Sequence, residues 1–224
     1  MAIQSLIDSL PYLMKGLLIT IVLTLASIFV ASIIGILMAM ARSYGKQPLP
    51  FLVYIYEKVF RGIPLLVIFF IIYFGLSQIG INLTAFAAAV AGLAIHSTAY
   101  QIQIYRSAIN SVPEGQMTAA MSLGMSKLKT IRYIIIPQVL RLSIPGWSNE
   151  FTIVLKDTSI AFSIGVIEIM RQGRYIYSRD PESTLYVLLF IALAYFILVF
   201  SANRGLSYLE KKYKLSGYEV ASVR

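Results

Sequence analysis

Apolar residues fill five long stretches of this chain, and shorter polar segments separate them. The stretches cover residues 16–41, 62–79, 84–105, 138–157 and 183–203. A helix that crosses a bilayer needs about 20 mostly apolar residues, so each stretch predicts one transmembrane helix. The polar segments are too short for a separate soluble domain. The pattern therefore predicts an all-α, polytopic membrane protein with five transmembrane helices in a single domain, residues 1–224.

The composition agrees with a membrane protein. Of the 224 residues, 58% are hydrophobic and 13% are charged, whereas soluble domains carry about a quarter charged residues. The chain has no cysteine, so it has no disulfides or thiolate chemistry from which to infer a redox compartment. The first stretch follows Asp8 and Lys15 without a basic leader or a small-residue cleavage site. We expect a retained helix there, not a signal peptide.

The net charge of +9 is unevenly distributed along the chain. The segments after the first and third stretches and the C-terminal tail carry an excess of basic residues: Arg42, Lys46, Lys58, Arg61, Arg106, Lys127, Lys129, Arg132, Arg204, Lys211, Lys212, Lys214 and Arg224. Basic residues collect in the cytoplasmic loops of membrane proteins. We therefore expect the N-terminus outside, the C-terminus in the cytoplasm, and a chain that crosses the cell membrane several times. Charge placed in this way does not indicate a nucleic-acid partner.

The polar segment 111–137 carries the signals of a helical hairpin. Ser111 and Glu114 have the spacing of a capping box, in which each side chain bonds the backbone N–H of the other residue. Gly124 suits the left-handed conformation that ends many helices, and Ser126 can cap a second helix. Pro137 interrupts that second helix before the fourth apolar stretch. The hairpin is either an amphipathic element on anionic lipid or a docking surface for a soluble partner.

Four sequence blocks resemble those of one family. The hairpin matches the EAA loop of ABC importer permeases at Gly115, Gln116, Ala119, Ala120, Gly124, Ile134 and Pro137. Residues 60–66 (FRGIPLL), 96–100 (HSTAY) and 155–159 (LKDTS) are similar to blocks of the polar amino acid permeases. The blocks follow the order of that family over about residues 12–205. One departure is Thr118, which stands where the family usually has a glutamate.

The resemblance implies a type I importer fold and a set of partners. The hairpin would be the coupling helix that sits in a groove of a cytoplasmic ATPase subunit, with these coupling residues: Gly115, Gln116, Ala119, Ala120, Gly124 and Pro137. ATP and Mg²⁺ would bind that ATPase, and no cofactor is expected in this chain, which lacks a GxxxxGK[ST] phosphate loop. A second permease subunit, identical or not, and an extracellular or periplasmic substrate-binding protein would complete the transporter.

Polar residues interrupt the fourth apolar stretch. An ionisable residue at membrane depth is costly unless it is paired or hydrated, so Glu150 and Asp157 are candidates for function. They lie seven residues apart and share a helix face. One interpretation places Glu150, Asn149 and Asp157 on a substrate path that favours arginine, lysine or histidine. The other makes Glu150 a hydrogen-bonded packing residue and gives Asp157 a structural or gating role.

Other features have simpler interpretations. His96 has no second histidine or carboxylate cluster near it in sequence, so we expect it to pack between helices and predict no metal site. Arg61 is expected to anchor the second stretch to lipid phosphate, with contact to the ATPase or the next subunit as the alternatives. The alanines before Gly92 predict close helix packing. Residues 158–182 predict an amphipathic helix at the outer interface, which by resemblance would meet the binding protein.

The resemblance, together with the membrane pattern, implies a permease subunit, not an enzyme, of an ATP-driven importer for polar or cationic amino acids. The alternative is an ATP-independent secondary transporter or channel subunit, in which Glu150 and Asp157 would couple ions. A membrane-embedded enzyme is disfavoured because no nucleophile and acid–base pair share a recognised spacing.

Overall fold

The computed structural model describes residues 2–213, so Lys214 and Arg224 of the basic tail lie outside the described residues. The α-helices are α1 (Ala2–Tyr44), α2 (Leu49–Gly62), α3 (Leu65–Phe70), α4 (Ala85–Asn110), α5 (Glu114–Ser122), α6 (Lys127–Thr130), α7 (Ile136–Leu142), α8 (Ile144–Asp157), α9 (Ile169–Arg179) and α10 (Thr184–Tyr213). Short π-helical or 3₁₀ turns extend or join several of them, at Ile71–Gly75, Leu76–Ile79, Ile131–Ile135, Thr158–Ile164 and Pro181–Ser183. Residues 2–213 contain no strand, and the predicted all-α class is confirmed.

The five-span count is not confirmed. Within the described residues three helices, α1, α4 and α10, are long and apolar enough to cross a membrane alone. A fourth span exists if α2 and the segment Leu65–Ile79 count as one, although their axes bend by 104°. The predicted span 138–157 consists of α7 and α8, which meet at Ser143 with Pro145 in the first turn of α8. Because proline lacks an N–H, it favours a break at this point.

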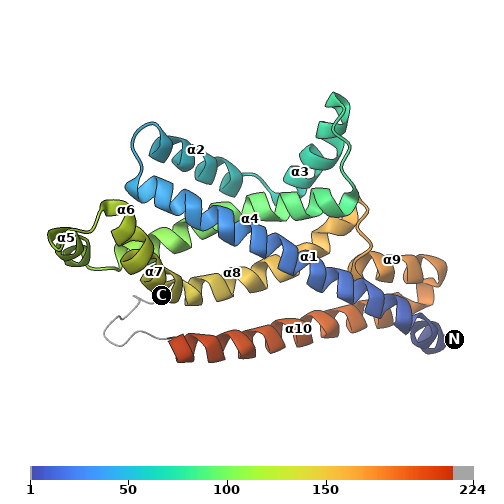
Figure 1. The fold of residues 1–224 in the computed structure, drawn as a ribbon. Helices are drawn as coiled ribbons and strands as arrows, with labels where there is room; N and C mark the ends of the chain where they lie inside the picture. The colour runs from blue at the N-terminus through green and yellow to red at the C-terminus, as the bar shows by residue number, and fades with distance from the viewer. Residues whose placement is uncertain (1, 214–224) are drawn as a thin grey trace.

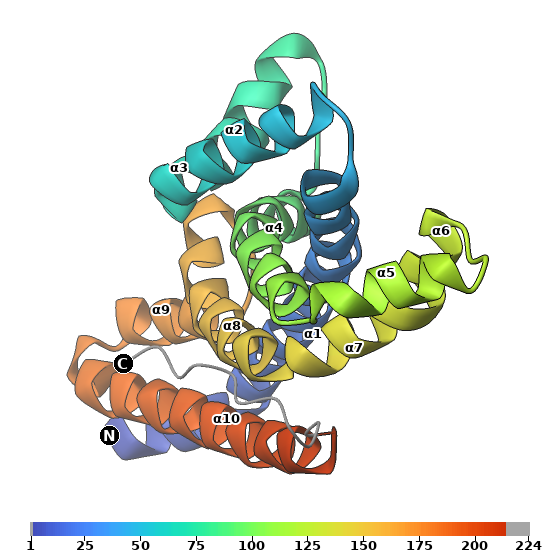
Figure 2. The ribbon, with the colours of Figure 1, turned by 90° about the vertical axis from the view of Figure 1, so that its left-hand side faces the viewer.

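Helix α4 is the centre of the fold. Figure 2 shows it enclosed by α1, α8 and the α2–α3 pair, with α10 on the far side of α8. Its small residues Ala88, Ala89 and Gly92 are buried, and a Cβ on Gly92 would lie 2.5 Å from the Phe69 ring. Glycine therefore lets α3 approach α4 closely, as the small-residue pattern predicted. The packing contact lies within one subunit.

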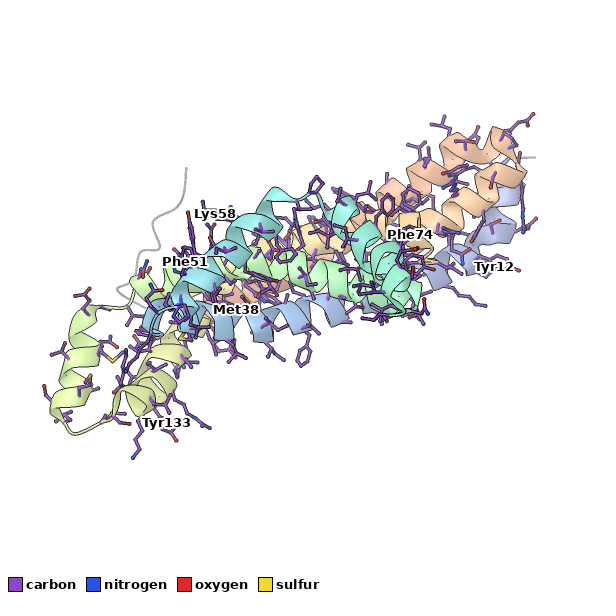
Figure 3. All side chains as sticks on the ribbon, turned by 90° about the horizontal axis from the view of Figure 1, so that it is seen from above. Tyr12, Met38, Phe51, Lys58, Phe74 and Tyr133 are labelled. Carbon is purple, nitrogen blue, oxygen red and sulfur yellow. The ribbon has the colours of Figure 1, made fainter. Side chains whose placement is uncertain are left out.

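The two ends of the molecule differ. One end carries α5, α6, the turn between α1 and α2 and the end of α10, while the other carries the N-terminus and α9 (Figure 1). The segments predicted to be basic and cytoplasmic thus lie together at one end. Tyr133 points away from the helices near that end, and Tyr12 and Phe74 lie toward the opposite end (Figure 3). Large apolar side chains on the outer faces of α1 and α10 are exposed, as expected for helices that face lipid or another subunit.

Candidate functional site

Glu150 lies in a buried polar cluster between α4 and α8. Its side chain is 4% exposed, and its Oε1 accepts a hydrogen bond of 2.6 Å from the Ser97 hydroxyl. Gln101, one turn along α4, donates to the same hydroxyl at 3.4 Å. The carboxyl group is therefore hydrogen-bonded within the subunit, which is the arrangement that the packing interpretation of Glu150 required. Sequence reasoning placed Ser97 in a family block but gave it no role.

The other two predicted substrate residues do not join this cluster directly. Asn149 is exposed on the neighbouring face of α8, and Asp157 is half-buried at the end of the helix. The charges of Asp157 and Arg61 lie close enough to act on Glu150. Within residues 2–213 no salt bridge joins Asp157 to the adjacent Lys156, as the helix geometry predicted.

A second buried carboxylate, Glu57, was not predicted. It lies in α2 and is 1% exposed. It forms a salt bridge with Arg42 of α1, accepts a hydrogen bond of 2.9 Å from Gln103 of α4, and lies 3.8 Å from Arg61. Glu57 therefore joins three helices through charged contacts. The signal in the sequence was its place on the buried face of an amphipathic helix, four residues after Val53.

The Arg61 side chain makes contacts within the protein, which differs from its predicted role as a lipid anchor. Its guanidinium lies 4.9 Å from the centre of the Tyr100 ring, and its Nε is buried. Glu57 and the aromatic face offer the cation two attractive contacts inside the protein. His96 is partly buried and packs against the same Tyr100 ring at 5.1 Å, in agreement with a packing role. The described residues contain no cluster of three metal-ligating side chains.

The hairpin forms with one predicted cap and without the other. Gly124 has φ +86° and separates α5 from α6, and Ser126 accepts a 3.4 Å bond from Lys129 N–H. The prediction of a capping box at Ser111 and Glu114, however, is wrong. Ser111 ends α4, and its hydroxyl donates to the Ser107 carbonyl, so Pro113 stands before α5 without a side-chain cap.

The predicted coupling residues occupy both faces of the hairpin. Gly115, Ala119, Gly124 and Pro137 are exposed, whereas Ala120 is buried. Gln116 accepts a 2.5 Å bond from Gln138, which connects α5 to α7. Two large apolar side chains at the tip are exposed among serines and lysines: Leu123 is 85% exposed and Leu128 is 76% exposed. They are available for contact with a partner.

Residues 31–215 match the family described as "Binding-protein-dependent transport system inner membrane component". The chain belongs to this family of membrane transport components.

The similar proteins within this family are components of amino acid transporters. The permease is 38% identical over 208 residues to the "Probable amino-acid ABC transporter permease protein YckA" of Bacillus subtilis, covering 92% of this chain and 91% of that one. It is 36% identical to the "L-cystine transport system permease protein TcyB" of the same organism, covering 85% and 81%. A solved structure, "Crystal structure of an amino acid ABC transporter with histidines", matches with a TM-score of 0.84 and 35% identity over 93% of this chain and 97% of that one.

The protein is thus an amino-acid ABC transporter permease subunit with a type I importer fold. Such subunits are not enzymes themselves, because the ATPase is a separate subunit. The ATP-independent transporter and the membrane-embedded enzyme are therefore wrong as descriptions of this chain.

At the opposite end of the permease, Glu168 caps α9, a role that sequence reasoning missed. It is fully buried and accepts bonds from Met170 N–H at 2.8 Å and Arg171 N–H at 2.9 Å. The helix α9 confirms the predicted helix in 158–182, but Ile169, Gly173 and Ile176 pack inward. Burial raises the pKa of the Glu168 carboxyl to about 7, although the two N–H bonds and Tyr195 oppose the shift.

The raised pKa predicts that stability depends on pH. Because the folded state binds the Glu168 proton more tightly than the unfolded state does, this contribution is complete below about pH 4.5 and is lost as the pH rises to about 7. Between those values the loss is up to roughly 1.4 kcal/mol per pH unit. We expect a lower thermal midpoint at pH 7.5 than at pH 5 for the purified protein and a smaller difference for Glu168→Gln. The exposed control Glu182→Gln should keep the wild-type difference, and an unchanged difference in Glu168→Gln would contradict the assignment.

Proposed function

We propose that this permease forms the translocation path of an ATP-driven importer for polar or cationic amino acids. Two cytoplasmic ATPase subunits bind ATP and Mg²⁺, and an external binding protein delivers the amino acid. A second permease subunit, identical or not, completes the path, because one small helical bundle cannot enclose it. The basic segments at the α5–α6 end support a cytoplasmic location for that end and for the C-terminus, with the N-terminus outside.

The observation that carries this proposal is the hairpin corner at Gly124. The α5–α6 hairpin projects from the other helices at the proposed cytoplasmic end (Figure 1). The side chains of Leu123 and Leu128 near its corner are exposed. Ala119 beside them leaves room for close approach of a partner surface. The coupling set of Gly115, Gln116, Ala119, Ala120, Gly124 and Pro137 would then transmit the closure of the ATPases to α7 and α8.

Reconstitution tests this function. We expect the permease, its ATPase and its binding protein in vesicles to accumulate labelled arginine or glutamine only when ATP is inside. A variant ATPase that binds ATP without hydrolysing it should abolish accumulation. Accumulation by the permease alone, without nucleotide, would overturn the proposal.

The proposed preference for cationic substrates rests on Glu150. Its carboxyl group is the acidic side chain most deeply buried in α8, with Asn149 and Asp157 on the same helix. A carboxylate on the path attracts a cationic side chain and repels an acidic one. The hydrogen bond from the Ser97 hydroxyl to Oε1 holds the carboxyl group in place.

Glu150→Gln should therefore reduce the ratio of arginine to glutamine uptake about tenfold, which corresponds to about 1.4 kcal/mol of lost attraction. Glutamine uptake should continue because the amide can still accept the bond from Ser97. The control Glu182→Gln removes an exposed carboxylate outside the bundle and should keep the wild-type ratio. An unchanged ratio in a transporting Glu150→Gln variant would leave Glu150 only the packing role.

A further inference from the structure

A cavity of about 620 Å³ lies at the base of the hairpin, where three helices meet. The end of α1 lines it with Arg42 and Tyr44, the end of α4 with Arg106 and Asn110, and the start of α5 with Pro113 and Glu114. None of these residues has a role in the proposed coupling set or in the Glu150 cluster. The cavity therefore needs its own explanation.

The positive charge in the cavity is only partly neutralised. Arg42 is paired with Glu57, but Arg106 lies close enough for the two guanidinium groups to repel each other. The Nε of Arg106 is buried and has no hydrogen-bond acceptor within residues 2–213. A buried donor without an acceptor is costly. Glu114 is the acidic residue on the wall, but it is exposed. The arrangement favours an anion beside Arg106.

The start of α5 adds to the positive potential. This nine-residue helix begins at Glu114 and has no side-chain cap, since the Ser111 hydroxyl donates to α4. The first N–H groups of a helix carry partial positive charge and suit anions. The helix terminus and the Arg106 guanidinium border the same cavity. Two independent features therefore point to the same kind of ligand.

The place of the cavity along the helices favours one source of the anion. Tyr44 and Asn110 are the last residues of two candidate membrane spans, Leu6–Tyr44 and Ala85–Asn110. The cavity thus lies where two apolar helices end, which favours a lipid head group as the source. Tyrosine is enriched at this level in membrane proteins. Guanidinium groups match phosphate oxygens in charge and in geometry.

We propose that this cavity binds the phosphate group of an anionic phospholipid, with Arg106 as the main ligand. Arg42 and the start of α5 contribute positive potential, and Asn110 lines the cavity at the end of α4. The bound head group connects α1, α4 and α5 at the base of the hairpin. This site is independent of the transported amino acid and of Glu150.

The test uses the full-length transporter complex in phosphatidylcholine nanodiscs that contain a small fraction of phosphatidylglycerol. Native mass spectrometry of the released complex should show phosphatidylglycerol retained in preference to phosphatidylcholine. Arg106→Gln should weaken this retention at least tenfold. Arg132→Gln removes an exposed arginine from the same end that does not line the cavity, and it should have no effect.

A second pair of variants tests the proposal independently, in case Arg106→Gln does not fold. Asn110→Asp places a negative charge on the cavity wall at an exposed position, and it should weaken retention. Ser107→Asp makes the matched change at an exposed position of α4 outside the cavity, and it should not. The proposal is overturned if neither Arg106→Gln nor Asn110→Asp changes retention. It is also overturned if inorganic phosphate alone occupies the site, or if an acidic side chain of the ATPase fills it regardless of lipid.

Discussion

Replacing Gly124 with valine is expected to uncouple ATP hydrolysis from amino acid uptake. Gly124 has φ +86°, and a side chain in this left-handed conformation costs about 1–2 kcal/mol. The corner would relax toward an ordinary helical or extended conformation and displace Leu123 and Leu128 from the surface that the ATPase is proposed to contact. We expect ATP-dependent uptake in reconstituted vesicles to fall about tenfold or more, because a loss of about 1.4 kcal/mol in the contacts that couple the two subunits is a factor of ten. ATP hydrolysis should lose its stimulation by the loaded binding protein.

The matched control for Gly124 is Gly80. Gly80 has φ +85°, and a Cβ there would meet nothing within 4 Å, as at Gly124. It ends the 3₁₀ turn Leu76–Ile79 at the opposite end of the molecule. Gly80→Val therefore introduces the same backbone strain away from the hairpin and should keep uptake coupled. Equal loss in both variants would show a general folding defect, and normal uptake in Gly124→Val would contradict the coupling role.

Replacing Glu57 with leucine is expected to produce the largest loss of stability. The change leaves Arg42 without its salt bridge, removes the nearby carboxylate from Arg61 and takes an acceptor from Gln103. Breaking a buried ion pair on one side costs about 3–5 kcal/mol, because the remaining charge stays buried. For a chain of this length the thermal midpoint should fall by about 10 °C.

The double variant Arg42→Met/Glu57→Leu separates charge from packing. Because both charges are removed together, its thermal midpoint should recover most of the loss. The exposed control Glu114→Leu should change the free energy of unfolding by less than about 0.5 kcal/mol. If the single and double variants were equally unstable, the contribution of Glu57 would come from packing and its bond to Gln103. The measurement is thermal unfolding of the purified protein in one detergent.

Local sequence signals predicted the corner of the hairpin correctly, but they predicted the wrong N-terminal cap for its first helix. Gly124 and Ser126 act through backbone bonds within four residues, so their roles follow from sequence. Ser111 failed as a cap because α4 extends to Asn110 and uses its hydroxyl at the preceding turn. A residue that could serve either the end of one helix or the start of the next is decided by where the first helix stops.

The buried charges could be predicted only in part. Glu150 was found because a carboxylate in an apolar stretch is conspicuous, but its partner Ser97 is 53 positions away and needs the α4–α8 contact to be known. Glu57 was overlooked because it lies among basic residues, and these were interpreted only as evidence for the membrane topology. The break after α2 has a local cause, because Pro64 holds Ile63 in an extended conformation, but the bend angle of 104° depends on packing that no local pattern gives.

The break at Ser143 separates two short helices but not their hydrogen bonding, since Ser143 N–H donates to Val139 and Trp147 N–H donates to Ser143. Residues 127–157 therefore form one nearly continuous helical segment, which runs from the Gly124 corner past Glu150. Under the proposed mechanism a displacement produced by nucleotide would travel along covalent bonds to the solute path. Its transmission would then depend on stiffness at this joint more than on any interface between helices.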